Sequence, residues 1–327
     1  MRLRYVPQLL IAAAALLFAA VQAFARGIAE EAPDSERLRV VATHSILGDF
    51  VANVAGDALE LSLLAGANQD PHVYEPAPAD SRALLEADIV FENGLLLKGW
   101  LDPLYAQSGS SATRVVVTHG VRLLEYDDEH GHDEHGHDEH GHDDEHLHGD
   151  YDPHVWQSVA NAIVMAENIR DALVDADPAN AELYTWNAAS YIAELEQLDR
   201  YILDLAETIP PDRRLLVTGH EAFAYFADRY GFRIVGAALG AVTTEGADPS
   251  AGEIAALIDD IRKAGSPVVF AESIVNPHLA RRVAEEAGAR FVAPIYSDAL
   301  DEPGTAAGTY IGMMRHNIET MVDALAE

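Results

Sequence analysis

The chain has 327 residues, no cysteine, and 54 acidic against 21 basic residues, for a formal net charge of -33. The length allows two domains with cores of their own, and the negative charge disfavours nucleic acid and anionic lipid as partners because like charges repel. The lack of cysteine excludes disulfides, thiolate metal sites and lipid attachment through an N-terminal cysteine. Any bound metal must therefore be held by nitrogen and oxygen.

The first residues have the pattern of an export signal. Arg2 and Arg4 precede an unbroken apolar run over 9–21, and a small-x-small cleavage site follows at Ala23-Phe24-Ala25. The run is shorter than the ~20 residues of a membrane span, which is the alternative interpretation. We therefore expect residues 1–25 to be a cleaved signal peptide and the mature protein to be periplasmic.

Beyond residue 38, strand and helix patterns alternate. Apolar runs predict strands at 38–43, 59–64, 88–91 and 114–118, and periodic patterns predict helices over 46–55 and 79–87. Such alternation is typical of βαβ units and a mainly parallel sheet. The sequence thus predicts an N-terminal α/β lobe over 38–177.

A histidine-rich segment interrupts this lobe at 127–150. It repeats Asp-Glu-His-Gly-His three times, and Leu147 is its one large aliphatic residue. Such a composition cannot bury a core, so we expect a disordered surface loop. Its histidines lie mostly two or three residues apart, which predicts several weak metal sites at His130, His132, His135, His137, His140, His142, His146 and His148. The alternative is a solvated charged loop with incidental affinity for metal.

Two helical patterns follow the loop. The first covers 157–174, and the second covers 178–208, with apolar residues such as Leu183 and Trp186 recurring every three to four positions. A helix of about 30 residues is about 45 Å long, which suits a rigid connection between two lobes.

The alternation then resumes in a C-terminal α/β lobe over 209–327. Its predicted strands are 214–218, 233–237, 267–271 and 290–294, and its predicted helices are 222–230, 249–264, 277–287 and 305–325. The expected fold class is α/β, with two lobes that each have a mainly parallel sheet flanked by helices and are joined by one long rigid helix.

Four residues stand out as candidate metal ligands. Asp-Pro-His-Val occurs twice, and its proline fixes the backbone before His72 and before His154. His220 and Asp298 each follow a predicted strand, where ligand sites of open α/β sheets lie. Three imidazoles and one carboxylate suit tetrahedral zinc. The alternatives are turn histidines for the first pair and helix caps for the second. His44 and His119, which also follow strands, are weaker candidates.

The same segments resemble a known family, the zinc/manganese solute-binding proteins of ABC importers (ZnuA-, TroA- and AztC-like, cluster A-I). The similar motifs are Asp70–Pro76, Asn93–Leu95, Asp152–Trp156, His220–Phe226, Ala247–Ser250 and the segment of Asp298. The resemblance implies two lobes around a stiff helix, with ligands at His72, His154, His220 and Asp298. It also implies a permease and its ATPase subunit as partners, with a metal-loading chaperone as a further candidate. A histidine at the third ligand position is associated with zinc in this family and a glutamate with manganese, so His220 favours zinc.

The expected function is capture of Zn(II) at one tight site in the interlobe cleft and delivery to an ABC permease, by a monomer that is not an enzyme. A manganese-specific protein of the same family is the main alternative. A zinc hydrolase is a less favoured alternative: it needs an open position for water, which direct ligation by Asp298 would close. A metal buffer or surface adhesin without a transporter is a further alternative.

Overall fold

The computed structural model describes residues 37–95, 97, 99–125, 151–236, 250–274 and 277–326. The expected signal peptide and the histidine-rich loop therefore lie outside the described residues. From Leu38 onward the chain forms one compact unit. No helix in the described ranges is long and apolar enough to span a membrane.

A four-stranded parallel sheet forms the N-terminal half. Its order is β2 (Leu59–Ala65), β1 (Leu38–His44), β3 (Ile89–Glu92) and β4 (Thr113–Val116). The central strand β1 is buried from Val40 to His44, as expected for a strand with both faces covered. α2 (Ser45–Ala55) and α3 (Pro78–Glu86) connect the first three strands, as the sequence predicts.

One helix of this half was not predicted. α4 (Leu101–Ser108) has eight residues, and Leu101 is the one that it buries completely. A helix this short with one buried position has no apolar period that a sequence pattern reveals. Its place matters, because Trp100 directly precedes it and contacts the loop that carries His72.

The C-terminal half contains two parallel strand pairs. β5 (Leu215–Val217) pairs with β6 (Arg233–Gly236), and β7 (Val268–Glu272) pairs with β8 (Arg290–Ile295). The helices between them are α7 (Ala224–Tyr230), α9 (Ala251–Ala264) and α10 (Pro277–Ala287). α9 begins with a capping box, in which Ser250 and Glu253 each bond the other's backbone N–H.

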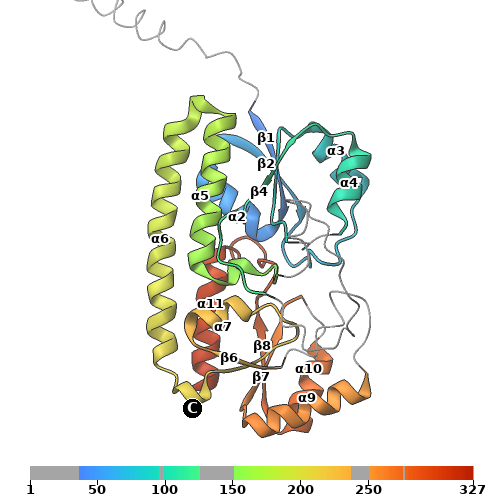
Figure 1. The fold of residues 1–327 in the computed structure, drawn as a ribbon, viewed down its shortest axis with the longest axis vertical. Coiled ribbons are helices and arrows are strands. Elements are labelled where there is room, and N and C mark those ends of the chain that lie inside the picture. The colour runs from blue at the N-terminus through green and yellow to red at the C-terminus, as the bar shows by residue number, and fades with distance from the viewer. Residues whose placement is uncertain are drawn as a thin grey trace, which may run out of the picture. The chain divides into compact units, whose positions relative to one another are not determined.

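Three long helices pack together beside the sheets. α6 (Ala181–Glu207) runs the length of the described structure, with α5 (Val159–Ala176) beside one half of it and α11 (Tyr310–Leu325) beside the other (Figure 1). The largest hydrophobic cluster joins these helices to α2, α7 and both strand groups. The α/β class with mainly parallel sheets and one long helix is confirmed.

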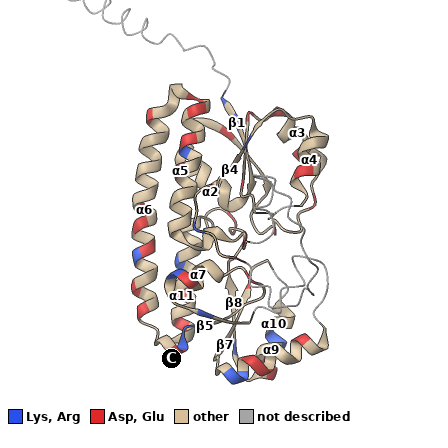
Figure 2. Cartoon of the chain, in the orientation of Figure 1, with Lys and Arg blue, Asp and Glu red and all other residues tan. Residues whose placement is uncertain are grey.

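The buried face of α6 differs from the predicted stripe. Trp186 is 74% exposed, whereas Tyr184, Ala188 and Tyr191 face the core. The apolar period is correct but its phase at the start of the helix is wrong, because aromatic residues stand on both faces there. Figure 2 shows acidic residues spread along the outer surface of α6 and over α9.

The last helix begins at Tyr310, five residues later than predicted. Thr309 is the N-cap, and its side chain accepts a hydrogen bond from Gly312 N (3.1 Å). The turns before it need a residue without Cβ at Gly308, where a Cβ would approach Glu302 O to 2.5 Å. A close approach of this kind is not visible as a break in the sequence pattern.

Candidate metal centre

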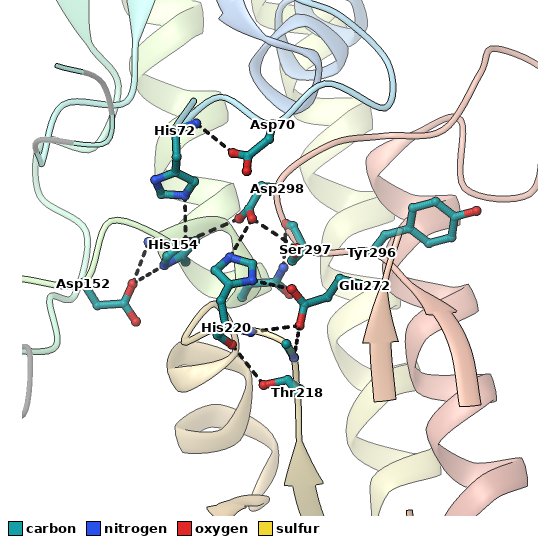
Figure 3. Close-up of polar contacts among 12 residues, drawn as sticks. Asp70, His72, Asp152, His154, Thr218, His220, Glu272, Tyr296, Ser297 and Asp298 are labelled. Carbon is teal, nitrogen blue, oxygen red and sulfur yellow. Dashed lines mark hydrogen bonds and ion pairs between the residues drawn. The ribbon is translucent and has the colours of Figure 1, made fainter. Parts of the chain in front are cut away.

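Four loops bring the four predicted ligands together, as Figure 3 shows. His72 lies in the loop after β2, and His154 precedes a turn of 3₁₀ helix at Val155–Gln157. His220 follows β5, and Asp298 follows β8. Three of the four ligands thus follow the carboxyl end of a strand, each from a different sheet.

The separations between the side chains match the edges of a small coordination polyhedron. One ligand atom from each of the four residues lies within 4.8 Å of the others. His72 Nε2 is 3.1 Å from His154 Nε2, His154 Nε2 is 3.4 Å from Asp298 Oδ1, and His220 Nε2 is 2.7 Å from Asp298 Oδ2. Ligands at the 2.0–2.1 Å of zinc–nitrogen bonds lie about 3.3 Å apart in a tetrahedron. The donor set therefore fits a tetrahedral ion.

The cluster is largely buried. His154, His220 and Asp298 are at most 3% exposed, and His72 is half-buried. Asp298 Oδ1 makes no hydrogen bond to any described residue, and the contact of His220 Nε2 at 2.7 Å is to Asp298 Oδ2, another member of the cluster. Buried polar atoms are nearly always paired in folded proteins, so the unpaired oxygen of Asp298 indicates that the site binds a polar or charged ligand.

Charge is concentrated in the cluster. Burial opposes ionisation of Asp298, but the imidazoles of His220 and His154 outweigh it and hold the pKa of Asp298 well below its ordinary value. Burial likewise opposes protonation of both histidines, yet nearby carboxylates outweigh it. Asp152 and Asp298 raise the pKa of His154, and Glu272 and Asp298 raise the pKa of His220. Burial, with Asp298 nearby, raises the pKa of Asp70 to about 6. The carboxylates of the metal-free site thus stabilise positive charge on the neighbouring histidines.

Each copy of the Asp-Pro-His motif fixes the backbone of its loop through a hydrogen bond between the aspartate and the histidine. In each copy, the carboxylate of the aspartate accepts the backbone N–H of the histidine, at 2.8 Å in both Asp70–His72 and Asp152–His154. Asp152 Oδ1 also lies 2.6 Å from His154 Nδ1, which directs Nε2 toward the cluster. Tyr225 OH donates to Asp152 O (2.7 Å) and fixes this loop to α7.

Sequence analysis missed Glu272, the last residue of β7. Glu272 is 2% exposed, its Oε1 accepts the backbone N–H of Gly219 (2.6 Å), and its Oε2 is bonded to His220 Nδ1. A carboxylate on Nδ1 leaves Nε2 free for a metal and makes it a stronger donor. The sequence did contain a signal for Glu272, since it ends a buried strand that pairs with β8, the strand that Asp298 follows.

The two weaker candidates lie outside the cluster. His44 is fully buried at the start of α2, where its ring centroid is 5.2 Å from that of Trp156. His119 is exposed, and its carbonyl accepts a hydrogen bond from Asn168 (2.8 Å). The eight histidines predicted as weak sites, from His130 to His148, lie outside the described residues.

The family model described as "Zinc-uptake complex component A periplasmic" matches residues 40–324. The chain belongs to this family. It is 34% identical over 294 residues to the manganese-binding lipoprotein MntA of Halalkalibacterium halodurans, with 90% of each chain covered. It is 31% identical to the manganese ABC transporter substrate-binding lipoprotein PsaA of Streptococcus mitis, with 91% of this chain and 92% of that one covered.

Solved structures of periplasmic metal-binding proteins have a similar fold. The periplasmic zinc binding protein TroA from Treponema pallidum has a TM-score of 0.78 at 27% identity, and the match covers 89% of this chain and all of that one. A cadmium-bound periplasmic metal binding protein from Candidatus Liberibacter asiaticus has a TM-score of 0.75 at 26% identity, with the same coverage. Both likenesses support the two-lobe α/β fold.

Membership of the family establishes the general role. The chain is a metal-binding, extracytoplasmic substrate-binding component of an ABC importer, which implies a permease and an ATPase as partners, and it is not an enzyme. Several relatives are named lipoproteins, whereas this chain contains no cysteine.

Proposed function

We propose that the chain is the zinc-binding component of its importer and that His72, His154, His220 and Asp298 are the ligands. The donor set carries the proposal: three imidazole nitrogens and one carboxylate oxygen lie within 4.8 Å of one another in a largely buried site. Zinc accepts four nitrogen and oxygen ligands in this geometry, whereas manganese prefers more oxygen.

The order of events follows from the charges. An imidazole must be neutral to coordinate, so zinc displaces protons from His154 and His220 as it enters. The carboxylate of Asp298 offsets part of the charge of the ion in a site with little water. All four residues then bind the metal, which is a complete shell for transport and leaves no position for a reactive water.

The wider arrangement belongs to the same proposal. The site lies between an N-terminal lobe over 38–177 and a C-terminal lobe over 209–327, with residues 178–208 connecting them. Residues 1–25 direct export to the periplasm, and the histidines of 127–150 add several weak zinc sites. The importer's permease receives the ion from the monomeric binding protein.

Manganese is the second candidate cargo. It is favoured by the names of the relatives MntA and PsaA, which are manganese-binding proteins at 34% and 31% identity. The same four residues would serve as ligands, so the two candidates differ in metal preference and not in site.

A competition titration tests the proposal. Residues 127–148 are deleted first. The deletion point is suitable because Glu125 and Tyr151 already form an antiparallel bridge, and Asp152 N donates to Leu124 O (3.0 Å). The metal-stripped protein is then titrated with zinc and with manganese against a chelator of known affinity.

We expect one tight zinc equivalent, which is lost or weakened by at least about 100-fold when His72, His154 or His220 becomes alanine. His119→Ala is the matched control, because His119 is exposed and lies outside the cluster. Tighter binding of manganese than of zinc would overturn the choice of metal. Wild-type affinity in all three histidine variants would overturn the site.

A further inference from the structure

The residue before each predicted ligand is held by a side chain from another segment. In three of the four cases a side-chain N–H donates to the carbonyl of that residue. The bonds are Trp100 Nε1 to Pro71 O (2.7 Å), Asn93 Nδ2 to Pro153 O (3.0 Å), and both Trp156 Nε1 and Gln157 Nε2 to Ser297 O (2.8 Å each). The fourth case is the Gly219–His220 peptide, whose N–H, that of His220, donates to Glu272 Oε1 (3.3 Å). The peptide plane leading into each ligand is therefore fixed.

Two of these donors, Asn93 and Gln157, are side-chain amides whose burial costs folding free energy. Both are fully buried, and their oxygens, Asn93 Oδ1 and Gln157 Oε1, make no hydrogen bond to any described residue. A buried acceptor without a partner lowers the stability of the fold, and an apolar side chain of the same shape would avoid that cost. Maximal stability therefore does not explain these two residues.

Together the two amides connect segments that carry different ligands. Asn93 follows β3, is itself fixed by Thr118 Oγ1 donating to its carbonyl (2.7 Å), and holds the peptide before His154. Gln157, three residues after His154, holds the peptide before Asp298 across the cleft. A continuous series of bonds thus runs from the first sheet through His154 to Asp298.

We propose that Asn93 and Gln157 are positioning residues that set the relative placement of His154 and Asp298, and through it the affinity for the metal. The inference rests on the proposed function, since it assumes that these two residues ligate zinc. The two ligand atoms lie 3.4 Å apart, close to the edge of a zinc tetrahedron. Rotation of either preceding peptide moves the attached side chain and changes this separation. Outer contacts of this kind determine how well ligands fit an ion.

The test uses Gln157→Met and Asn93→Leu, which keep the size of each side chain and remove the N–H donor. Gln197→Met is the matched control, because Gln197 is exposed on α6 and bonds only Ala193 O of its own helix among the contacts described. Zinc affinity is measured by chelator competition, and the melting temperature of the metal-free protein is measured in parallel. We expect about 10-fold weaker zinc binding for Gln157→Met, where Trp156 still holds the carbonyl, and about 10–100-fold for Asn93→Leu. The metal-free melting temperature should be unchanged or higher.

A double-mutant comparison separates positioning from general stability. In an Asp298→Ala background, which retains the three histidines, Gln157→Met should weaken zinc binding less than about 2-fold, because the ligand through which it acts is gone. Asn93→Leu should likewise lose its effect in a His154→Ala background.

Three results would overturn the inference: unchanged zinc affinity in both single variants, the same fold loss with and without the ligand, or a metal-free melting temperature that falls in step with affinity. In each of these the wild-type protein still binds zinc, so the proposed function survives. Absence of tight zinc binding in the wild-type protein would remove both proposals together.

Discussion

Replacing Glu272 with glutamine removes one acceptor from the group that orients His220. The two oxygens of Glu272 serve two donors, because Oε1 accepts the N–H of Gly219 and Oε2 bonds His220 Nδ1. Glutamine has one oxygen and one NH₂, so one of the two donors must face the NH₂ group. If that donor is His220 Nδ1–H, the ring shifts its proton to Nε2, which then cannot bind a metal until the proton moves back.

The size of the effect follows from the role of such partners in other metal sites. Loss of a residue that orients a ligating histidine typically costs 10–100-fold in metal affinity, or about 1.4–2.7 kcal/mol. Glu272 is 2% exposed, so no solvent can replace the lost acceptor cheaply. We therefore expect Glu272→Gln to weaken zinc binding by about 10–100-fold, and at least as much as Glu272→Ala, which leaves the ring free to choose its proton.

The assay is chelator competition on the protein without residues 127–148. Glu286→Gln is the control, because Glu286 forms an exposed ion pair with Arg282 on α10 (2.8 Å) and such pairs contribute little. Circular dichroism of each metal-free variant checks that the fold persists. Wild-type zinc affinity in Glu272→Gln, with the fold intact, would refute the reasoning that Glu272 orients the ligand.

Three further outcomes are expected. Nearby carboxylates raise the pKa values of His154 and His220. The protonated histidines therefore stabilise the metal-free protein below pH 6.5, the ordinary pKa of histidine, and this contribution is lost as the pH rises through the raised values. Calorimetry at pH 7 in buffers of different ionisation enthalpy should show release of about one to two protons per zinc, and release of none would contradict this. Burial raises the pKa of Asp49 to about 6, so ionisation of Asp49 destabilises the fold increasingly from pH 3.8 to 6. Asp49→Asn keeps an acceptor for the N–H of Tyr310 and should raise the free energy of unfolding by up to about 3 kcal/mol at pH 7.5 but little at pH 4. The control Asp57→Asn, at an exposed position, should show no such pH-dependent gain. His220→Glu replaces an imidazole with oxygen and should lower the zinc-to-manganese affinity ratio by roughly 10-fold or more, and an unchanged ratio would show that this position does not select the metal.

Much of the fold follows from local pattern. The strands of both halves are short apolar runs, and each begins and ends within about two residues of its predicted bounds. The exceptions have local causes: α4 buries one residue completely, and the start of α11 depends on the cap at Thr309. The phase of α6 was mistaken at Trp186 because a periodic pattern does not say which face another helix covers.

The cluster was predicted for a physical reason as well as by family resemblance. His220 and Asp298 each follow a predicted strand, where ligand sites of open α/β proteins lie, so both could be predicted as ligands without coordinates. Glu272 obeys the same rule but was overlooked. Gln157 belongs to no periodic or spaced pattern, and only the folded structure shows that its amide reaches Ser297.

Zinc K-edge X-ray absorption of the protein without residues 127–148, loaded with one equivalent of zinc, tests the central claim most directly. The account predicts a four-coordinate shell at about 2.0 Å with the multiple-scattering pattern of three imidazoles and one oxygen ligand. The imidazole pattern should decrease by one ring in His220→Ala and remain in Asp298→Ala. A shell of six oxygens, or a spectrum unchanged by His220→Ala, would contradict it.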